Sequence, residues 1–365
     1  AQRAVERIQR RQEMKMAKYA IGIAGRIGTG KTTLARALAV RTNGRVLSLA
    51  GAVKGAALGI CGIGAFFPQV DGFASRNVLQ SIGHGVRERY AEDVWVAIIA
   101  QLIELCQESV VIIPDIRYPN EVAFLKERFG EQNCLTIRLA GEPFISSCSS
   151  HLAHESENAL NGFSDYDLVL NCRNDLCCNV EAVLHEVKNR GWKVSPRNIR
   201  VYISVNVMGN GKFSDEFEAI ANWLSFAGCE PITPVSSTDF LQWSEEFGLS
   251  PDKASWNRVV NDLKGVSESD AVLAWLKSSS IGSAIEIFAA ALMQKPVVAI
   301  VQEQMIAHPF LRAFAKVIAV PDASSVDEWF VLMAAYEIRK MLGFANGGGY
   351  DVIANTGAAF GNSRQ

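Results

Sequence analysis

Long apolar runs are scarce in this chain of 365 residues. The longest, such as residues 110–114 and 296–301, are far shorter than the roughly 20 residues that a membrane span requires. The first residues are charged and contain no apolar signal core. From these absences we expect a soluble, cytoplasmic protein that does not bind a membrane.

An excess of charge of either sign is also missing. The 36 lysines and arginines nearly balance 38 aspartates and glutamates, which gives a formal net charge of −2. Proteins that coat nucleic acid need a basic surface, so nucleic acid is an unlikely partner. Residues 1–16 mix basic with acidic residues, which favours a solvated helix over a DNA-binding arm.

Paired cysteines of the CxxC type are absent as well. Eight cysteines are scattered along the chain. Cys177 and Cys178 are adjacent, but they lack the second pair of ligands that a zinc site needs. We therefore expect reduced thiols rather than a disulfide framework.

Short apolar segments alternate with longer helical segments from residue 19 onward, as in a parallel sheet covered by helices. The expected strands are 19–24, 45–49, 110–114, 135–139 and 168–171, then 199–205, 271–275 and 296–301. One expected helix starts at Lys31, and the others span 93–108, 179–190, 213–227, 284–293 and 326–342. A mixed segment extends up to Leu263.

This alternation predicts an α/β protein with two parallel sheets. Because a polar segment at 192–198 separates the two series, we expect domains at 17–195 and 199–342. A helix at 1–16 and a Gly-rich tail at 343–365 would flank them.

Residues 25–32, Gly-Arg-Ile-Gly-Thr-Gly-Lys-Thr, fit the pattern GxxxxGK[ST]. The segment lies between an apolar strand and a helix, where such a loop can turn its backbone N–H groups toward an anion. Lys31 can reach the β- and γ-phosphates of ATP, and the Thr32 hydroxyl can join the shell of Mg²⁺. The alternative is a Gly-rich turn that only lets the strand pack on the helix. We expect ATP and Mg²⁺ as cofactors, bound by Gly25, Gly28, Gly30, Lys31, Thr32 and Thr33.

The apolar strand at 110–114 delivers Asp115 and Arg117 to its carboxyl end, where doubly wound sheets bind ligands. Asp115 could hold Mg²⁺ through water or orient an acceptor, and Arg117 could clamp a phosphate. The alternative is that these two side chains only pair with each other.

A Gly-bounded helix within 79–95 supplies Arg87, Asp93 and Trp95. Its cations suit the phosphate of a nucleoside monophosphate, and its carboxylate suits a sugar or base. Trp95 could stack on the base, although packing in the core is the favoured role.

Five segments in this order resemble the bacteriophage-type deoxynucleoside monophosphate kinases, a P-loop kinase family, over residues 17–195. They are residues 25–33, 49–54, 79–95, 115–121 and 154–157. The resemblance implies transfer of the ATP γ-phosphoryl group to a deoxynucleoside monophosphate (dNMP), with Lys31, Asp115 and Arg117 as catalytic residues. For a phage-encoded protein, the location would be the cytoplasm of the infected cell. The resemblance places Arg87, Asp93, Arg117 and the segment from His154 to Glu157 near the acceptor or a closing lid. Lys54 and Trp95 are further candidate substrate-binding residues.

In the second half, residues 269–291 predict a strand, a serine-rich turn and a helix that carries Glu286. A serine-rich turn at a helix N-terminus suits oxygen or phosphate groups, and the helix dipole would keep Glu286 ionised. An ionised carboxylate that faces a pocket can act as a nucleophile. The alternative is that Ser280 only caps the helix and Glu286 lies on the surface.

Residues 199–340 resemble the nucleoside 2-deoxyribosyltransferase superfamily, which includes dNMP N-glycosidases. The resemblance lies in the segments 201–204, 256–262, 269–291 and 295–300. It implies that Glu286 attacks the anomeric carbon of the sugar and that Asp262 serves the departing base. Ser280 and Gly282 would hold the 5′ end, and Tyr202 and Asp270 would also contact the substrate.

We therefore predict a bifunctional, homo-oligomeric enzyme of deoxynucleotide metabolism, whose small-molecule partners are dNMP and ATP. A first alternative makes the second domain a catalytically silent module that binds nucleotides or forms dimers. A second alternative is a kinase for a modified base in DNA, or a nucleotide switch. The balanced charge counts against DNA as a substrate.

Overall fold

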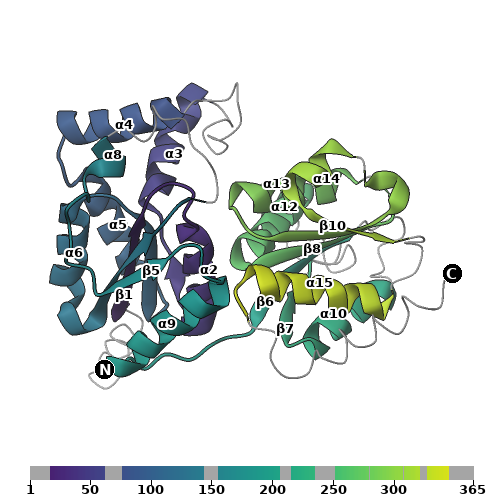
Figure 1. Ribbon diagram of the computed structural model, residues 1–365. Coiled ribbons are helices and arrows are strands. Elements are labelled where there is room, and N and C mark those ends of the chain that lie inside the picture. Colours follow the sequence, from purple (N-terminus) through teal and green to yellow (C-terminus); the bar gives the residue numbers. More distant parts are fainter. Residues whose placement is uncertain are drawn as a thin grey trace, which may run out of the picture. The chain divides into compact units, whose positions relative to one another are not determined.

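The computed structural model describes residues 17–61, 76–143, 155–205, 215–234, 251–278, 280–306, 308–320 and 327–344. The expected helix at 1–16, residues 345–365 of the tail and His154 lie outside them. The chain separates into two compact units between Arg197 and Asn198 (Figure 1). None of the helices in this described part combines the length and apolarity that crossing a bilayer would need.

The described strands of the first unit form a parallel five-stranded sheet in the order β2-β3-β1-β4-β5. Its strands are β1 (Tyr19–Gly25), β2 (Arg45–Val46), β3 (Val110–Ile116), β4 (Cys134–Ala140) and β5 (Leu168–Asn171). Its helices are α2 (Lys31–Thr42), α3 (Leu49–Cys61), α4 (Arg76–Arg89), α5 (Val94–Glu104), α6 (Pro119–Phe129), η2 (Glu131–Asn133), α8 (Glu155–Asn158) and α9 (Leu176–Asn189).

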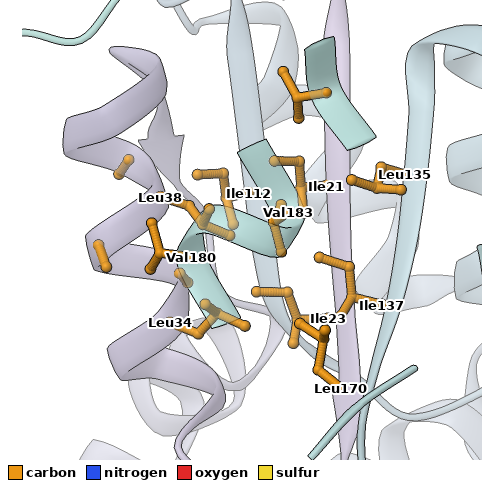
Figure 2. Packing of buried hydrophobic residues seen from close by; sticks show 14 of the residues in the cluster. Ile21, Ile23, Leu34, Leu38, Ile112, Leu135, Ile137, Leu170, Val180 and Val183 are labelled. Carbon is orange, nitrogen blue, oxygen red and sulfur yellow. The ribbon is translucent and has the colours of Figure 1, made fainter. Parts of the chain in front are cut away.

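Helices cover both faces of this sheet, because alternate residues of each buried strand point to opposite sides. Ile21 and Ile23 of β1 face α2 and α9, whereas Ala20 and Ala24 face α3, α5 and α6. Figure 2 shows the first of these cores, in which leucines of α2 and valines of α9 pack on isoleucines of the sheet. This packing holds the carboxyl ends of the strands together at one edge of the sheet.

The second unit contains another parallel five-stranded sheet, in the order β10-β9-β8-β6-β7. Its strands are β6 (Ile199–Val205), β7 (Cys229–Ile232), β8 (Ala271–Leu276), β9 (Val297–Gln302) and β10 (Lys316–Val320). Its helices are α10 (Asp215–Phe226), α12 (Pro251–Glu268), α13 (Ile281–Leu292), η3 (Glu303–Met305), α14 (Pro309–Phe314) and α15 (Glu328–Met341).

The chain of the second unit first adds β7 on one side of β6 and then returns to add β8 on the other side. The carboxyl ends of β6 and β8 therefore flank a topological switch point, where open α/β sheets form a ligand crevice. Helices α12, α13 and α14 cover the face of the sheet that carries Tyr202.

The predicted α/β class with two parallel sheets is confirmed, but several element boundaries differ. The strand expected at 45–49 ends at Val46, because the chain turns into α3 at Leu49. The mixed segment before Leu263 contains the helix α12. The strands β7 and β10 were not expected, since they are short edge strands of only four and five residues with partly exposed faces.

Candidate active sites

The loop from Gly25 to Lys31 joins β1 to α2 at the carboxyl edge of the first sheet. Gly28 and Gly30 have φ angles of 74° and 85°, a left-handed conformation that side chains other than glycine disfavour. Lys31 is only 9% exposed, and its Nζ donates to Gly25 O at 2.8 Å and to Arg26 O at 2.7 Å. The loop therefore holds a buried ammonium at the N-terminus of α2, where the helix dipole also favours anions.

Asp115 caps a helix. Its two carboxylate oxygens accept hydrogen bonds from Ser48 Oγ at 2.7 Å, Leu49 N at 3.1 Å and Ala50 N at 2.5 Å. These bonds fasten the N-terminus of α3 to the end of β3 and satisfy backbone donors that have no partner within the helix. The carboxylate that the sequence assigns to Mg²⁺ or an acceptor is thus engaged in the fold.

Mg²⁺ would have to share such carboxylates. Among the described residues, no group of three or more His, Cys, Asp or Glu side chains is placed to hold a metal ion. A direct bond to Asp115 would compete with three hydrogen bonds, so contact through water is the arrangement that fits this residue.

Arg87 lies against the turn between β3 and α6. Its guanidinium carbon is 3.8 Å from the centroid of the Tyr118 ring, and its Nη1 is 3.6 Å from Glu121 Oε1. Its Nη2 donates to Asn120 Oδ1 at 3.4 Å. The Arg87 and Glu121 side chains are only 11% and 6% exposed, and burial raises the pKa of Glu121 to about 7. Nearby Asp115 also raises this pKa, while the N–H groups of Arg117 and Tyr118 and the charge of Arg87 lower it.

A cavity of about 240 Å³ opens at the carboxyl ends of β1, β3 and β4; we call it the first-unit cavity. Arg117 and Arg138 both line it, and Arg117 Nη1 also donates to Ser156 O at 3.4 Å. The guanidinium of Arg138 lies over the Tyr166 ring at 5.8 Å. The full lining is Gly25, Arg26, Ile116, Arg117, Arg138, Leu139, Ala140, Gly141, Glu142, Ser156, Leu160, Asn161 and Tyr166. The cavity therefore joins the Gly25 loop to two arginines, whereas Arg87 is not among the described residues of its wall.

Arg138 and Tyr166 are lining residues that the sequence did not lead us to expect. A signal for Arg138 was available, because it is a charged residue near the carboxyl end of an otherwise apolar buried strand. Tyr166 lies in the irregular segment between α8 and β5, and no local pattern predicts that it approaches β4.

Trp95 belongs to the core. It is 7% exposed, and its Nε1 donates to Gly83 O at 3.0 Å, which ties α5 to α4. We therefore remove Trp95 from the proposed acceptor residues, since a buried ring cannot stack on a base.

For the remaining predicted residues of the first unit, the structure gives their position in the fold. Asp93 is exposed just before α5, and Lys54 is half-buried on α3. Thr32 and Thr33 lie in the first turn of α2. The side chain of Glu157, on α8, is outside the described residues, as is His154.

In the second unit, Glu286 is held between two hydroxyl groups. Tyr202 Oη donates to its Oε1 at 2.9 Å, and Ser204 Oγ donates to its Oε2 at 2.5 Å. Tyr202 and Ser204 are two positions apart on β6, so both point to the face that α13 covers. Both are fully buried. This cluster lies at the switch point, because Ser204 pairs with Ala274 near the ends of β6 and β8.

The pKa of Glu286 is raised to about 7, chiefly because burial disfavours its charged form. The bonds from Ser204 and Tyr202 and the charge of Arg258 oppose this shift, while the charge of Asp262 adds to it. The expectation that the helix dipole keeps Glu286 ionised is therefore corrected. Near neutral pH, both the protonated and the ionised form of the Glu286 carboxyl group are therefore populated.

Asp262 reaches this cluster because α12 packs closely on β6. A Cβ at Gly265 would lie only 2.8 Å and 2.9 Å from two Tyr202 ring carbons, so glycine permits the approach. Asp262 is three residues earlier on the same helix and hence on the same side. Its Oδ2 is 4.0 Å from Arg258 Nε.

Ser280 is the N-cap of α13, and its Oγ accepts from Ser283 N at 3.3 Å. The capping role that the sequence left open is thus observed, whereas Glu286 is not a surface residue. Gly282 is exposed in the first turn, where a Cβ would meet Ser280 Oγ only at 3.8 Å.

Asp270 lies at the opposite edge of the second sheet. It precedes β8, its Oδ2 accepts from Arg200 N at 2.8 Å, and its N donates to Arg200 O at 2.7 Å. In a parallel sheet the strand starts and strand ends form opposite edges. We therefore remove Asp270 from the substrate site and assign it to the pairing of β6 with β8.

Replacing Glu286 by glutamine should stabilise the chain more at high pH than at low pH. Because the folded state raises the pKa of Glu286 from 4.5 to about 7, the stability linked to its proton is present at low pH and is lost as the pH rises through about 7. Glutamine has no such loss. Urea unfolding at about pH 5 and about pH 8 should show a stabilisation that grows by about 2 kcal/mol. An equal difference at both pH values would contradict the raised pKa.

Known proteins resemble this chain only distantly. No protein-family model matches it, and no curated protein matches it. Similar solved structures include a sugar kinase from a Janibacter species, with 16% identity and a TM-score of 0.29, covering 47% of this chain and 95% of the kinase. Shikimate kinases from Aquifex aeolicus and Bacteroides thetaiotaomicron have 15% and 17% identity and TM-scores of 0.28 and 0.26, each covering 47% of this chain and 98% of the kinase.

Proposed function

We propose that the first unit is a phosphotransferase that moves the γ-phosphoryl group of ATP to a dNMP. The observation that carries the proposal is the first-unit cavity, which joins the Gly25 loop to Arg117 and Arg138. Phosphoryl transfer depends on positioning and on cations around the transferring group more than on covalent help. A P-loop next to two arginines supplies those cations.

The Gly25 loop fits ATP by its chemistry. It combines backbone donors at a helix N-terminus with the buried ammonium of Lys31. Mg²⁺, when bound, would neutralise charge on the phosphates, with Thr32 in its shell and Asp115 joined to it through water. Lys31 would leave the loop carbonyls to bind the phosphate oxygens.

The acceptor phosphate would bind to Arg117 and Arg138, whose guanidinium groups present forked donors to a dianion. Ser156 and Tyr166 would orient these two arginines. The resemblance adds Asp93 and the segment from His154 to Glu157 as contacts to the base, the sugar or a closing lid, and Lys54 is a further candidate.

The test is to incubate the full chain with each common dNMP, with and without ATP and Mg²⁺, and to separate the products. We expect dNDP only when ATP is present. Hydrolysis of ATP without any dNDP would overturn the dNMP assignment.

Replacing Arg117 by lysine should raise the KM for dNMP by about tenfold or more while changing the KM for ATP little, because a single ammonium cannot make the forked contact. Steady-state kinetics with each substrate varied in turn would measure both constants. Arg128→Lys, on the exposed side of α6, is the matched control. Equal increases in both KM values would move Arg117 out of the acceptor site.

For the second unit, we propose cleavage of the N-glycosidic bond of a deoxynucleotide, on the basis of the half-buried Glu286 that Tyr202 and Ser204 hold at the switch point. Ionised Glu286 would attack the anomeric carbon and form an ester with the sugar. The bond to the base would break with its electron pair moving to the base, and Asp262 would supply the proton. Water, or a second base, would then release the sugar.

The alternative for the second unit is a silent module that binds a nucleotide or forms dimers. Free base among the products of the dNMP incubation supports the glycosidase. A kinase rate that responds to a nucleotide bound near Ser280, without any base release, supports the silent module. We also propose that the chain forms a homo-oligomer, which light scattering would test.

A further inference from the structure

Glu121 occupies the third position of α6, and its side chain is only 6% exposed. We propose that Glu121 is a positioning residue of the phosphotransferase site, which fixes the backbone at Arg117 so that this arginine faces the cavity and which holds Arg87 outside it. The inference rests on the proposed phosphotransferase function. It gives Arg117 and Arg87, two cations of the same predicted site, different roles.

One carboxylate oxygen of Glu121 accepts from two backbone N–H groups. Glu121 Oε2 accepts from Arg117 N at 2.7 Å and from Tyr118 N at 3.1 Å. The bond to Tyr118 N completes a capping box at the start of α6. The shorter bond to Arg117 N is outside the capping box, so it constrains the residue that leaves β3 and points toward the cavity. The direction of the Arg117 side chain follows from that backbone.

The other carboxylate oxygen of Glu121 lies near Arg87. Glu121 Oε1 is 3.6 Å from Arg87 Nη1, while the Arg87 guanidinium stacks on Tyr118 and contacts Asn120. Tyr118, Asn120 and Glu121 of the turn therefore hold Arg87 in place. Because Arg87 comes from α4, this contact also ties α4 to the turn that carries Arg117.

The burial of Glu121 has a cost in free energy. A glutamate in the first turn of a helix normally keeps its charge in water, and burying a carboxylate is unfavourable unless it is paired and hydrogen-bonded. Glu121 is buried with two backbone donors and one cation around it. A capping box accounts for the bond to Tyr118 N, but not for the bond to Arg117 N or for the approach of Arg87.

The test compares Glu121→Gln with Glu121→Ala, and uses Glu127→Gln on the exposed side of α6 as control. Glutamine keeps an oxygen for the two N–H groups and loses the charge that holds Arg87; alanine loses both. We expect Glu121→Ala to raise the KM for dNMP by about tenfold or more with the KM for ATP nearly unchanged. Glu121→Gln should restore the KM for dNMP to within about threefold of the wild type.

A second measurement needs no turnover. The full chain is treated with phenylglyoxal, which modifies accessible arginines, and the rates at Arg87 and Arg117 are read by peptide mass spectrometry. We expect faster modification of Arg87 in both variants and an altered rate at Arg117 only in Glu121→Ala. If Glu121→Ala does not fold, Glu121→Met, which fills a similar volume but offers no carboxylate oxygen, takes its place. The rate at Arg87 in Glu121→Gln then decides the part of the proposal that concerns Arg87, and the rate at Arg117 in Glu121→Met, which we expect to change, decides the other part.

Three results would overturn the inference. They are unchanged modification rates in both variants, equal rises in the two KM values of Glu121→Ala, and a Glu121→Gln variant as impaired for dNMP as the alanine variant. A wild-type chain that makes no dNDP overturns the phosphotransferase function instead, and the modification rates still show whether Glu121 positions the two arginines.

Discussion

Replacing Lys31 by alanine should lower the rate of dNDP formation by about a thousandfold or more, because the transferring phosphoryl group loses the cation at the N-terminus of α2. Lys31 is the buried ammonium of the Gly25 loop, and its Nζ donates to the carbonyls of Gly25 and Arg26. The variant also leaves Gly25 O and Arg26 O without this donor. A coupled assay for ADP, with dNDP separated by chromatography, would measure the rate.

The matched control is Lys188→Ala, which removes an exposed lysine from the last turn of α9. It should keep the wild-type rate. Thermal unfolding of both variants would separate a loss of chemistry from a loss of folded protein. A Lys31→Ala variant that is folded and retains a rate within about threefold of the wild type would contradict the role of the loop.

Replacing Glu286 by glutamine should eliminate the release of free base while leaving dNDP formation unchanged. Glutamine is close in shape and can still accept from Tyr202 Oη, but its neutral amide cannot attack the anomeric carbon. The two reactions are independent in this design because Glu286 and Lys31 lie in separate cores. Chromatography of the base released from each dNMP would measure the effect.

The wild-type rate of base release should also rise with pH across about 7, since only ionised Glu286 is a nucleophile and its pKa is raised to about 7. Glu268→Gln, an exposed change on α12, is the control and should leave base release intact. Base release by folded Glu286→Gln at the wild-type rate would remove Glu286 from the chemistry.

Two acidic residues illustrate what a sequence pattern leaves open. Asp115 lies at the end of β3, and Glu286 lies on α13 and faces the end of β6. Both residues were candidates for catalysis. Asp115 instead meets donors that lie 65 to 67 residues earlier in the chain, and it caps α3. Glu286 accepts from two hydroxyls of β6, and its partial burial raises its pKa, which is the direction opposite to the one that its helix suggested.

Features that depend on neighbours along the chain could be predicted from the residues alone. The alternation of apolar strands and helices follows from local periodicity, and it predicted both sheets. The Gly25 loop was equally accessible, because its glycines, its lysine and the helix N-terminus lie within seven residues of one another. Asp270 also carried a local signal, since a residue before a parallel strand lies at the edge opposite the ligand crevice.

Which cations reach the first-unit cavity, and which side chains support them, depends on contacts between distant segments. Arg117 directly follows β3, and Arg138 lies on β4. They converge because the sheet order brings β3 and β4 to either side of β1. Arg87 has the same charge, yet Glu121 and Tyr118 hold it outside the cavity wall. Contact between distant segments sets burial, hydrogen bonding and pKa, and a single sequence does not specify those contacts by residue type alone.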